Sequence, residues 1–527
     1  MTHVVMLVAN DVSTDSRVKK EALAVARTGL SVTVVGLTAG NQRAESLLGP
    51  VRVIRVPVSY TLRDSRVRKR VRLRQARPPF FWYRFDADRA AAEIRLQLGQ
   101  QAVRDATARA LSLRRKASRN HVRVSRDGVV LGRWRLRALA GRHTIIRGRY
   151  GAGRVVNVGL KLSWRAFDAA VNRIATRAHW SSLLPEVYDL ELALGPAIDE
   201  LQPDVIHAHD MQVMGVAADA CARAHLTGRR VPWIYDAHEY VAGLSQYGGR
   251  TPRVIAAWAS LEQEYIRSAS RVVTVSPAIA EALQHRYALP RRPAVVLNTP
   301  VRDPPGPNRP SVRETVDLPA GTPLLVYSGV VTHARGVHTA IEAMAKLPEA
   351  HLVVVCVPHT ETWAVQRTRP LADEFGVADR VHFIDPVPSG QVVDFLESAD
   401  IGLIPILHFP SHEMSLSNKM FEYLDAGLPV VVSNCRTQAD FVRSHGLGEV
   451  FRAEDPTDLA DAVQRVLDDR PRYAKALDDP QLLDQFSWHR QEEVLRDIYG
   501  QVLGRELHWR DPDDPRRVVD LSERPAQ

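Results

Sequence analysis

Residues 417–433, SNKMFEYLDAGLPVVVS, are the most informative part of the chain for its fold. A helical pattern in this stretch ends at a glycine and continues directly as an apolar strand. Apolar residues recur at helical spacing from Met420 to Leu424, which leaves Lys419 and Glu422 directed toward the crevice at the start of the helix. The free N–H groups and the dipole of such a helix start favour a diphosphate, and a carboxylate one turn along can accept two hydrogen bonds from a ribose. The stretch therefore indicates nucleotide chemistry.

The composition describes a globular protein with large apolar cores. The chain has 527 residues, of which 45% are apolar and 25% are charged, enough for two or three domains. Its three cysteines, Cys221, Cys356 and Cys435, lie far apart without metal-ligand spacing, so we expect a reducing compartment and no disulfide framework. No signal peptide or membrane-spanning run is evident. We expect a cytoplasmic protein, either free or peripheral on the cytoplasmic face of the membrane.

Positive charge is concentrated in one segment of the chain. The net charge is +10, but residues 61–180 hold 30 Lys and Arg against 7 Asp and Glu, or +23, so the remainder carries 10 − 23 = −13. A solvated arginine-rich surface and an anionic membrane surface are equally good interpretations, and nucleic acid is less favoured because no RNA-binding or helix-turn-helix signature is present. The run Pro78-Pro79-Phe80-Phe81-Trp82-Tyr83, bracketed by arginines, suits a bilayer surface.

Strands and helices alternate on both sides of this basic insertion. The pattern predicts a first α/β domain over 1–300, with parallel, buried strands. Inside the insertion we expect helices at 89–117 and 165–178 and a hairpin that turns at Asp127-Gly128. The expected strands of the domain are 3–9, 31–36, 51–57, 204–208, 231–236 and 271–275, and its expected helices are 15–28, 188–201, 211–225, 252–269 and 277–286.

A second alternating series follows a proline-rich linker at 301–315 and predicts another α/β domain over 316–485. The expected strands are 323–328, 351–357, 380–384, 401–405 and 428–432, and the expected helices are 336–346, 368–375, 389–398, 418–426 and 456–469. A last helix within 486–505 is placed to cross back to the first domain. Residues 506–527 have the polar composition of a disordered tail.

Short motifs spread along both series carry a family resemblance. They are Asp15-Ser16-Arg17-Val18, Asp204-Val205-Ile206-His207-Ala208-His209-Asp210, Tyr235-Asp236-Ala237-His238-Glu239, Tyr327-Ser328-Gly329, Arg335-Gly336 and Asn418-Lys419-Met420-Phe421-Glu422-Tyr423. In this order and spacing the chain resembles the family-four glycosyltransferases. The resemblance implies the GT-B fold, two Rossmann-like domains with the active site between them. It also implies transfer of a sugar from a nucleoside diphosphate donor, held by the C-terminal domain, to an acceptor held mainly by the N-terminal domain.

The resemblance assigns roles to particular residues. On the donor side, Glu422 would hold the ribose hydroxyls, Arg335 would neutralise the diphosphate as the sugar bond breaks, and Lys419 would contact phosphate. Asn418 and Gly329 complete the expected donor site. His238, next to the reacting sugar, and Arg335 are the expected catalytic residues, the histidine as hydrogen-bond donor or proton carrier. Expected on the acceptor side are Asp11, Asp15, Arg17, His209, Asp210 and Glu239, all in loops that also need polar caps.

Three positions depart from the family pattern. An acid often found ahead of the ribose-binding glutamate would fall on Met414, with Glu413 one place away. Val330 stands where members often have an arginine, so Arg335 has fewer partners. Asn10-Asp11 replaces the glycine-rich loop after the first strand. The first departure indicates a different contact with the donor sugar.

No metal or other cofactor is expected, because helix termini and basic residues take over the diphosphate charge in this fold. Asp86-Ala87-Asp88 and Asp511-Pro512-Asp513 match the Asp-x-Asp pattern of the other major glycosyltransferase fold, but neither follows a nucleotide-binding strand, so both are treated as chance matches. The expected activity is a retaining transfer to a glycan, glycolipid or other hydroxyl acceptor. A nucleotide-sugar epimerase and a non-catalytic scaffold that binds a nucleotide sugar or a membrane are the alternatives.

Overall fold

The computed structural model describes residues 1–65, 180–246, 250–302, 309–510 and 521–525, with a few isolated helical residues between 96 and 145. The chain divides into two compact units, one made of residues 1–63 and 179–527 and the other of residues 64–178. The helices and the hairpin expected inside the insertion, and both Asp-x-Asp matches, lie outside the described residues. The architecture below is that of the first unit.

The N-terminal lobe is built on a doubly wound sheet. Its strand order is β15-β3-β4-β2-β1-β5-β6-β7-β8, and all pairs are parallel except the two that involve β3. The chain starts at β1 in the middle, winds outward through β2 and β4, and returns to continue from β5 on the other side. The strands are β1 (His3–Leu7), β2 (Ser31–Thr38), β3 (Ala44–Leu48), β4 (Val51–Pro57), β5 (Val205–His209), β6 (Trp233–Ala237), β7 (Arg271–Thr274), β8 (Ala294–Val295) and β15 (Arg524–Pro525).

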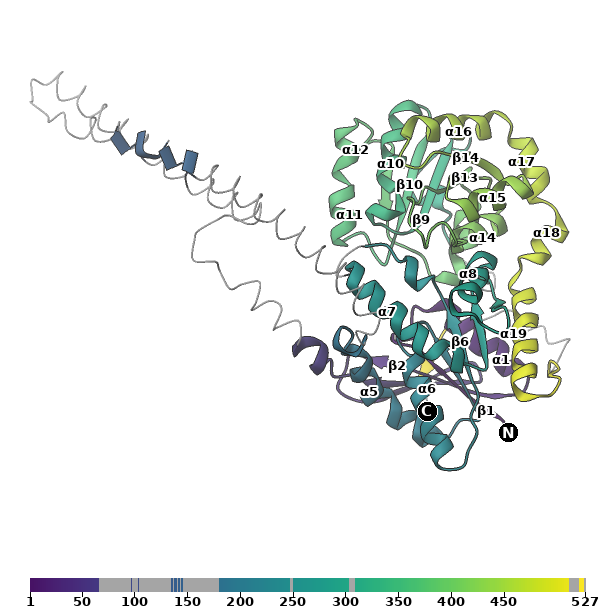
Figure 1. The fold of residues 1–527 in the computed structure, drawn as a ribbon. Helices are drawn as coiled ribbons and strands as arrows, with labels where there is room; N and C mark the ends of the chain where they lie inside the picture. Colours follow the sequence, from purple (N-terminus) through teal and green to yellow (C-terminus); the bar gives the residue numbers. More distant parts are fainter. Residues whose placement is uncertain are drawn as a thin grey trace, which may run out of the picture. The chain divides into compact units, whose positions relative to one another are not determined.

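Helices cover both faces of this sheet, which is why its central strands are buried and mostly apolar. On one face, α1 and α19 share a core with Val4 and Met6; on the other, α5 to α8 pack over Val5 and Leu7. Helix α19 comes from the far end of the sequence and lies beside α1 (Figure 1). The helices are α1 (Ser16–Arg27), α5 (Glu186–Leu201), α6 (Met214–Leu226), α7 (Pro252–Tyr265), α8 (Pro277–Tyr287) and α19 (Trp488–Leu503).

The C-terminal lobe contains a six-stranded, fully parallel sheet in the order β11-β10-β9-β12-β13-β14. Counted from β9, this is the 3-2-1-4-5-6 order of nucleotide-binding sheets. The strands are β9 (Leu324–Val330), β10 (His351–Val357), β11 (Val381–Ile384), β12 (Ile401–Ile404), β13 (Val430–Ser433) and β14 (Gly448–Phe451). Its helices are α9 (Val312–Thr315), α10 (Val337–Ala343), α11 (Trp363–Thr368), α12 (Pro370–Glu374), α13 (Val392–Leu396), α14 (Asn418–Asp425), α15 (Arg436–His445), α16 (Pro456–Asp468), α17 (Arg470–Leu477) and α18 (Pro480–Gln485).

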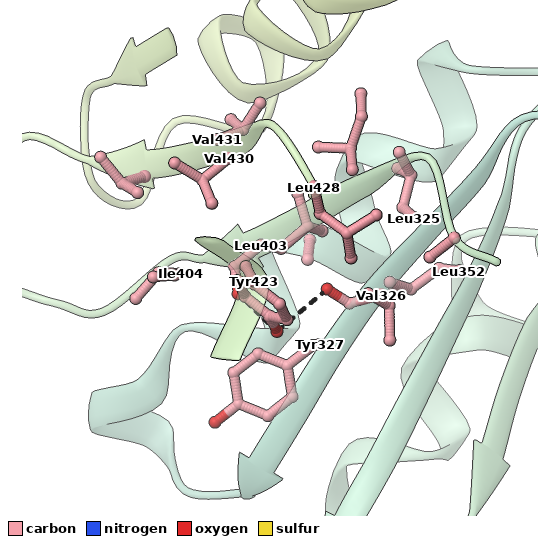
Figure 2. Packing of buried hydrophobic residues seen from close by; sticks show 14 of the residues in the cluster. Leu325, Val326, Tyr327, Leu352, Leu403, Ile404, Tyr423, Leu428, Val430 and Val431 are labelled. Carbon is pink, nitrogen blue, oxygen red and sulfur yellow. Dashed lines mark hydrogen bonds between the residues drawn. The ribbon is translucent and has the colours of Figure 1, made fainter. Parts of the chain in front are cut away.

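Helix α14 is fixed to this sheet by one aromatic side chain. The ring of Tyr423 crosses β12 at Gly402, where an added Cβ would lie 2.3 Å from the ring. The Tyr423 hydroxyl donates to the carbonyl oxygen of Val326 at 3.3 Å (Figure 2). It also accepts from the N–H of Ser328 at 3.0 Å. Because the buried ring sets the rotation of a two-turn helix, it also sets where Lys419 and Glu422 project.

The structure differs from the sequence-based expectation at the tail and the linker. Residues 524–525 pair with β3, and Glu523 forms ion pairs with Lys19 and Arg55, so the disorder expected from residue 506 does not hold there. The linker contains a short helix, α9, closed by a capping box between Ser311 and Glu314. In the described part of the chain, every helix is too short or too polar to cross a bilayer.

Candidate functional site at the switch points of the two sheets

The donor residues expected from the sequence gather at the switch point of the second sheet, between β9 and β12. Gly329 lies near the end of β9 with a φ of +141°, and a Cβ at this position would lie 2.8 Å from Nζ of Lys419. The lysine side chain can occupy this place only because residue 329 is a glycine. Ligands of doubly wound sheets bind at such a point.

Lys419 and Glu422 are charged groups in a poorly solvated environment. Burial and the charge of Arg335 together lower the pKa of Lys419 to about 7, although the charge of Glu422 opposes the shift. Burial likewise raises the pKa of Glu422 against the charges of Lys419 and Lys20. Among the described residues, neither side chain has a hydrogen bond or an ion pair. Unpaired charges in such a place are typical of a site that awaits a ligand.

A tight turn places Arg335 near Lys419 at this switch point. Arg335 ends the short 3-10 helix His333–Arg335, and the following Gly336 has a φ of +69°. A Cβ on Gly336 would lie 1.8 Å from the carbonyl oxygen of Pro405, so only glycine fits. Arg335 acts electrostatically on Lys419 of its own lobe and on Glu239 of the N-terminal lobe.

The start of α14 is open. Asn418 is exposed, and the N-cap Ser417 makes no side-chain capping hydrogen bond. The first amide of the helix region with a backbone acceptor is that of Met420, bonded to the carbonyl of Ser417 at 2.9 Å. Together with Lys419, the helix start supplies donors and positive charge of the kind that binds phosphate.

The switch point of the first sheet, between β1 and β5, holds a different kind of charge cluster. Asp236, fully buried at the end of β6, accepts two hydrogen bonds from Arg17, both at 2.8 Å. Its Oδ2 also contacts Nδ1 of His209 at 3.2 Å and Nε2 of His238 at 3.0 Å. Arg17 also forms an ion pair with Glu21 at 3.0 Å and donates a hydrogen bond to the Val296 carbonyl at 2.8 Å. This network is almost completely paired.

The interaction of His238 with Asp236 determines the charge of the imidazole. Burial acts to lower the pKa of this imidazole, but the charge and hydrogen bond of Asp236 outweigh it and raise the pKa to about 9. His238 is therefore protonated at neutral pH, a state that donates hydrogen bonds and does not accept a proton. The proton-carrier role considered from the sequence stays a prediction, and in this charge state it would begin with donation of a proton.

A few buried polar atoms of this cluster have no hydrogen-bond partner among the described residues. Both carboxylate oxygens of Glu21 and the Nε2 atoms of His207 and His209 are buried without hydrogen bonds among the described residues. With Asp236, these residues are close enough to share a metal ion. The two carboxylates already face two cations, Arg17 and protonated His238, so a dication here would add buried charge without compensation.

Two of the expected acceptor residues act as caps. Asp15 accepts from the N–H of Val18 at 3.1 Å as N-cap of α1, and Asp11 accepts from the N–H and hydroxyl of Ser13 at 3.1 and 2.7 Å. Between them, Val12 takes a φ of +68°, the conformation that a glycine-rich loop would supply. The space comes from Gly36, whose absent Cβ would lie 2.7 Å from Asn10 O.

Asp210 and Glu239 lie at the ends of β5 and β6, next to His238. Burial raises the pKa of Glu239, Asp210 adds to the shift, and Arg250, Arg335 and His238 oppose it. Glu239 thus stands between the charge cluster of the first lobe and Arg335 of the second. It and Asp210 are better placed for an acceptor than Arg17, whose donors are used within the buried network.

The loop at 405–417 makes contacts with the N-terminal lobe. Ser276 Oγ donates to the carbonyl of Met414 at 2.6 Å, and the N–H of Ser411 donates to the Gly243 carbonyl at 2.9 Å. The Met414 side chain packs against the apolar core of the N-terminal lobe. Glu413 instead accepts from the N–H of Arg436 at 2.8 Å and caps α15.

The sequence pointed to most of these residues but missed two. Asp236 organises the first cluster, and its place inside a quoted motif was the available signal. Lys20, on α1, is buried and interacts electrostatically with Glu422; nothing in the sequence separates it from the neighbouring Lys19.

Family comparisons match both lobes. Residues 308–478 match "Glycosyl transferases group 1", and residues 135–303 match "Glycosyltransferase Family 4". Among curated proteins, D-inositol 3-phosphate glycosyltransferase of Xylanimonas cellulosilytica is 28% identical over 199 residues, 37% of this chain and 46% of that protein. The enzyme of the same name from Mycolicibacterium smegmatis is 26% identical over 314 residues, 57% of this chain and 68% of that protein. The matches thus span about half to two thirds of these relatives.

Solved structures share the fold at low sequence identity. Sucrose-phosphate synthase from Thermosynechococcus elongatus superimposes with a TM-score of 0.60 at 14% identity, covering 96% of this chain and 100% of that one. Anabaena HepE in complex with UDP-glucose gives a TM-score of 0.52 at 12% identity, covering 95% and 100%. The fold predicted from the sequence is confirmed. The chain has the GT-B fold and resembles the family-four glycosyltransferases in both of its lobes.

Proposed function

We propose that this protein is a glycosyltransferase that moves a sugar from a nucleoside diphosphate sugar to a hydroxyl acceptor. The observation that carries the proposal is a set of charges at the switch point of the second sheet that have no ion-pair partner among the described residues. They are Arg335 and Lys419 as cations and Glu422 as carboxylate, beside Gly329 and an open helix start. This combination matches a diphosphate attached to a ribose. Relatives named as glycosyltransferases point to the same activity.

Two cations would hold the diphosphate. Val330 takes the place of an arginine common in the family, but Lys419 reaches the neighbouring Gly329 from α14 and can provide the missing charge. Arg335 would be the second cation, and the first-turn amides of α14 would add hydrogen bonds. Glu422 would accept from the ribose hydroxyls, each charge-assisted bond contributing about 1.5–3 kcal/mol.

In the reaction, the bond between the sugar C1 and the diphosphate oxygen breaks and a bond from C1 to the acceptor oxygen forms. The acceptor proton passes to the leaving diphosphate, so no protein nucleophile is required and the configuration at C1 is retained. Arg335 and Lys419 would stabilise the leaving charge, and protonated His238 would donate a hydrogen bond to the donor sugar or its phosphate. Retention rests on the family resemblance.

Asp210 and Glu239 are the residues we propose for the acceptor hydroxyl, since both interact electrostatically with His238 and Glu239 also interacts with Arg335. The curated relatives are named for D-inositol 3-phosphate. Inositol phosphates therefore belong in an acceptor screen beside glycans and glycolipids.

The test begins with a thermal-shift screen of UDP-, GDP-, TDP- and ADP-sugars, because specific binding raises the melting temperature by mass action. The donor found there is then titrated by calorimetry into Glu422→Ala, which should lose binding while remaining folded. Glu449→Ala, on β14, is the matched control and should bind normally. Unchanged donor affinity in Glu422→Ala would refute the ribose role.

A non-catalytic nucleotide-sugar-binding protein is the second candidate, favoured by one observation. Position 414, where the family often has an acid, holds a methionine that packs against the other lobe. Incubation with the donor alone and with acceptors distinguishes the candidates: transfer supports the enzyme, conversion of the donor alone supports an epimerase, and binding without turnover supports the non-catalytic protein.

The basic segment 61–180 remains a proposed membrane contact, supported by its charge of +23. Near an anionic leaflet each basic residue contributes about 1 kcal/mol, so a few of them would suffice. Flotation with anionic liposomes should weaken at high salt and disappear when the segment is deleted. Equal flotation with neutral lipid would contradict this role.

A further inference from the structure

Lys20 lies where several parts of the chain meet. Its Nζ donates to Oδ1 of Asn298 at 2.8 Å and to the carbonyl oxygen of Thr299, two residues that directly precede the linker to the C-terminal lobe. The same ammonium lies 4.6 Å from the ring centroid of Trp488, where the chain returns to the N-terminal lobe as α19. Lys20 thus contacts both passages of the chain between the lobes.

The same ammonium also interacts with the donor helix. The charges of Lys20 and Glu422 act on each other, although the two groups form no direct ion pair. Lys20 is 2% exposed, so this interaction is weakly screened by solvent. Its neighbour Lys19 is equally buried but faces elsewhere, toward Glu523, Ser13 and the carbonyl of Leu521.

The surroundings of the linker leave room for movement. A cavity of about 110 Å³ lies beside it, lined in part by Pro300, Leu424 and Trp488. Pro300 directly precedes the linker, Leu424 lies on the donor helix α14, and Trp488 begins the return helix α19. A hinge needs such loose packing, since a close-packed junction resists displacement.

We propose that Lys20 is a positioning residue that couples the occupancy of Glu422 to the interlobe linker. With the donor site empty, its ammonium is shared between the Glu422 charge and the oxygen atoms at 298–299. A ribose on Glu422 changes that charge balance, and the hold of Lys20 on the linker changes with it. This rests on the proposed function of Glu422, but the coupling itself is measurable without a nucleotide.

Hydrogen exchange of the full chain, followed by mass spectrometry, tests the coupling. Glu422→Gln removes the carboxylate charge in the second lobe and should change hydrogen exchange of the amides of residues 297–299 and 301, where the linker begins, at least threefold. In a Lys20→Met background the same substitution should have no effect on these amides, whereas in Lys20→Arg the effect should persist. Glu449→Gln is the control in the second lobe and Lys19→Met is the control on α1; neither should alter the response.

If Glu422→Gln leaves the linker amides unchanged, or changes them equally in the Lys20→Met background, the coupling is refuted. Should Lys20→Met fold poorly, the response of the single Glu422→Gln variant in the wild-type background still decides. Calorimetry with UDP-glucose, and with the other screened nucleotide sugars, is a separate readout. A linker response without loss of donor binding in Glu422→Gln would refute the proposed function and leave the coupling intact.

Discussion

The two switch points of this protein hold similar numbers of charged groups in opposite states. At the first sheet, Arg17, Asp236 and His238 are joined to one another by hydrogen bonds of 2.8 to 3.0 Å. At the second sheet, among the described residues, Lys419 and Glu422 are poorly solvated but have no hydrogen-bonded partner. Buried charges that are already paired stabilise a framework, whereas buried charges without partners cost free energy that a ligand can recover.

The comparison assigns different consequences to substitutions at the two places. Loss of a group from the paired cluster leaves its partners buried without a counter-charge and should reduce the stability of the fold. Loss of a group from the unpaired set removes a cost of folding and should reduce only ligand binding. The following experiments test this difference between the paired and the unpaired charges.

Arg17→Met should have the largest effect. It leaves the carboxylates of Asp236 and Glu21 buried without their cation, and breaking a buried ion pair costs about 3–5 kcal/mol. The free energy of unfolding in urea measures this loss. Arg43→Met, at a partly exposed ion pair with Glu200, is the control and should cost less than about 1 kcal/mol. Similar losses in the two variants would mean that the buried cluster is not a framework.

Gly402→Ala should disturb the unpaired set through the helix that carries it. The new Cβ would lie 2.3 Å from the Tyr423 ring, and relief of such a contact typically costs about 1–3 kcal/mol. The displaced ring should move α14 and weaken donor binding in calorimetry. Gly215→Ala, where an added Cβ has ordinary contacts of 3.5 Å or more, should leave binding unchanged. Wild-type affinity in Gly402→Ala would show that Tyr423 does not set the donor site.

The pH dependence of donor binding should follow Lys419. Its pKa of about 7 means that it loses its proton as the pH rises through neutrality, while a nucleotide sugar carries the same charge throughout. Affinity should therefore fall about tenfold between roughly pH 6 and 8.5, as expected for loss of one cation. Lys419→Arg keeps its charge and should show a flat profile in calorimetry. A flat profile in the wild type would place the phosphate elsewhere.

The same lowered pKa predicts the stability of Lys419→Met. Between a pH of about 7 and the ordinary value of 10.5, the unfolded lysine binds a proton that the folded one does not, so its cost is full below pH 7 and fades as the pH rises. The variant should gain stability relative to the wild type at pH 6 and lose that advantage by pH 10. Destabilisation at pH 6 would mean that Lys419 has a partner in the folded protein.

Removal of divalent metal should have the smallest effect. Because Arg335, Lys419 and the start of α14 supply positive charge to the diphosphate, dialysis against EDTA should change donor affinity less than about twofold. Loss of binding that Mg²⁺ or Mn²⁺ restores would contradict this assignment and would make the cation set incomplete.

The sequence predicted the alternation of strands and helices well where apolar runs are long, as in β10 and α14. It missed α15, whose residues Arg436–His445 are mostly polar, and β14, a four-residue strand between turns. Such elements exist because neighbouring strands supply their hydrogen bonds and apolar contacts. The pairing of β15 with β3 depends in the same way on residues almost 500 positions away.

For the site, the helix pattern at 417–433 pointed to Lys419 and Glu422, and the family resemblance pointed to Arg335; their roles in donor binding stay predictions. Local patterns were not sufficient to separate paired charges from unpaired ones. Arg17 and Lys419 are both buried cations in the first turn of a helix, yet only the folded chain brings Asp236 to the first and a glycine to the second.

Hydrophobic spacing and glycine positions within short segments were enough to predict two doubly wound sheets and a helix start that suits a nucleotide. Tertiary structure decided the protonation of His238, the freedom of Lys419 and the junction at Lys20. The physical reason is that charge state depends on burial and on neighbours, and those neighbours come from segments hundreds of residues apart.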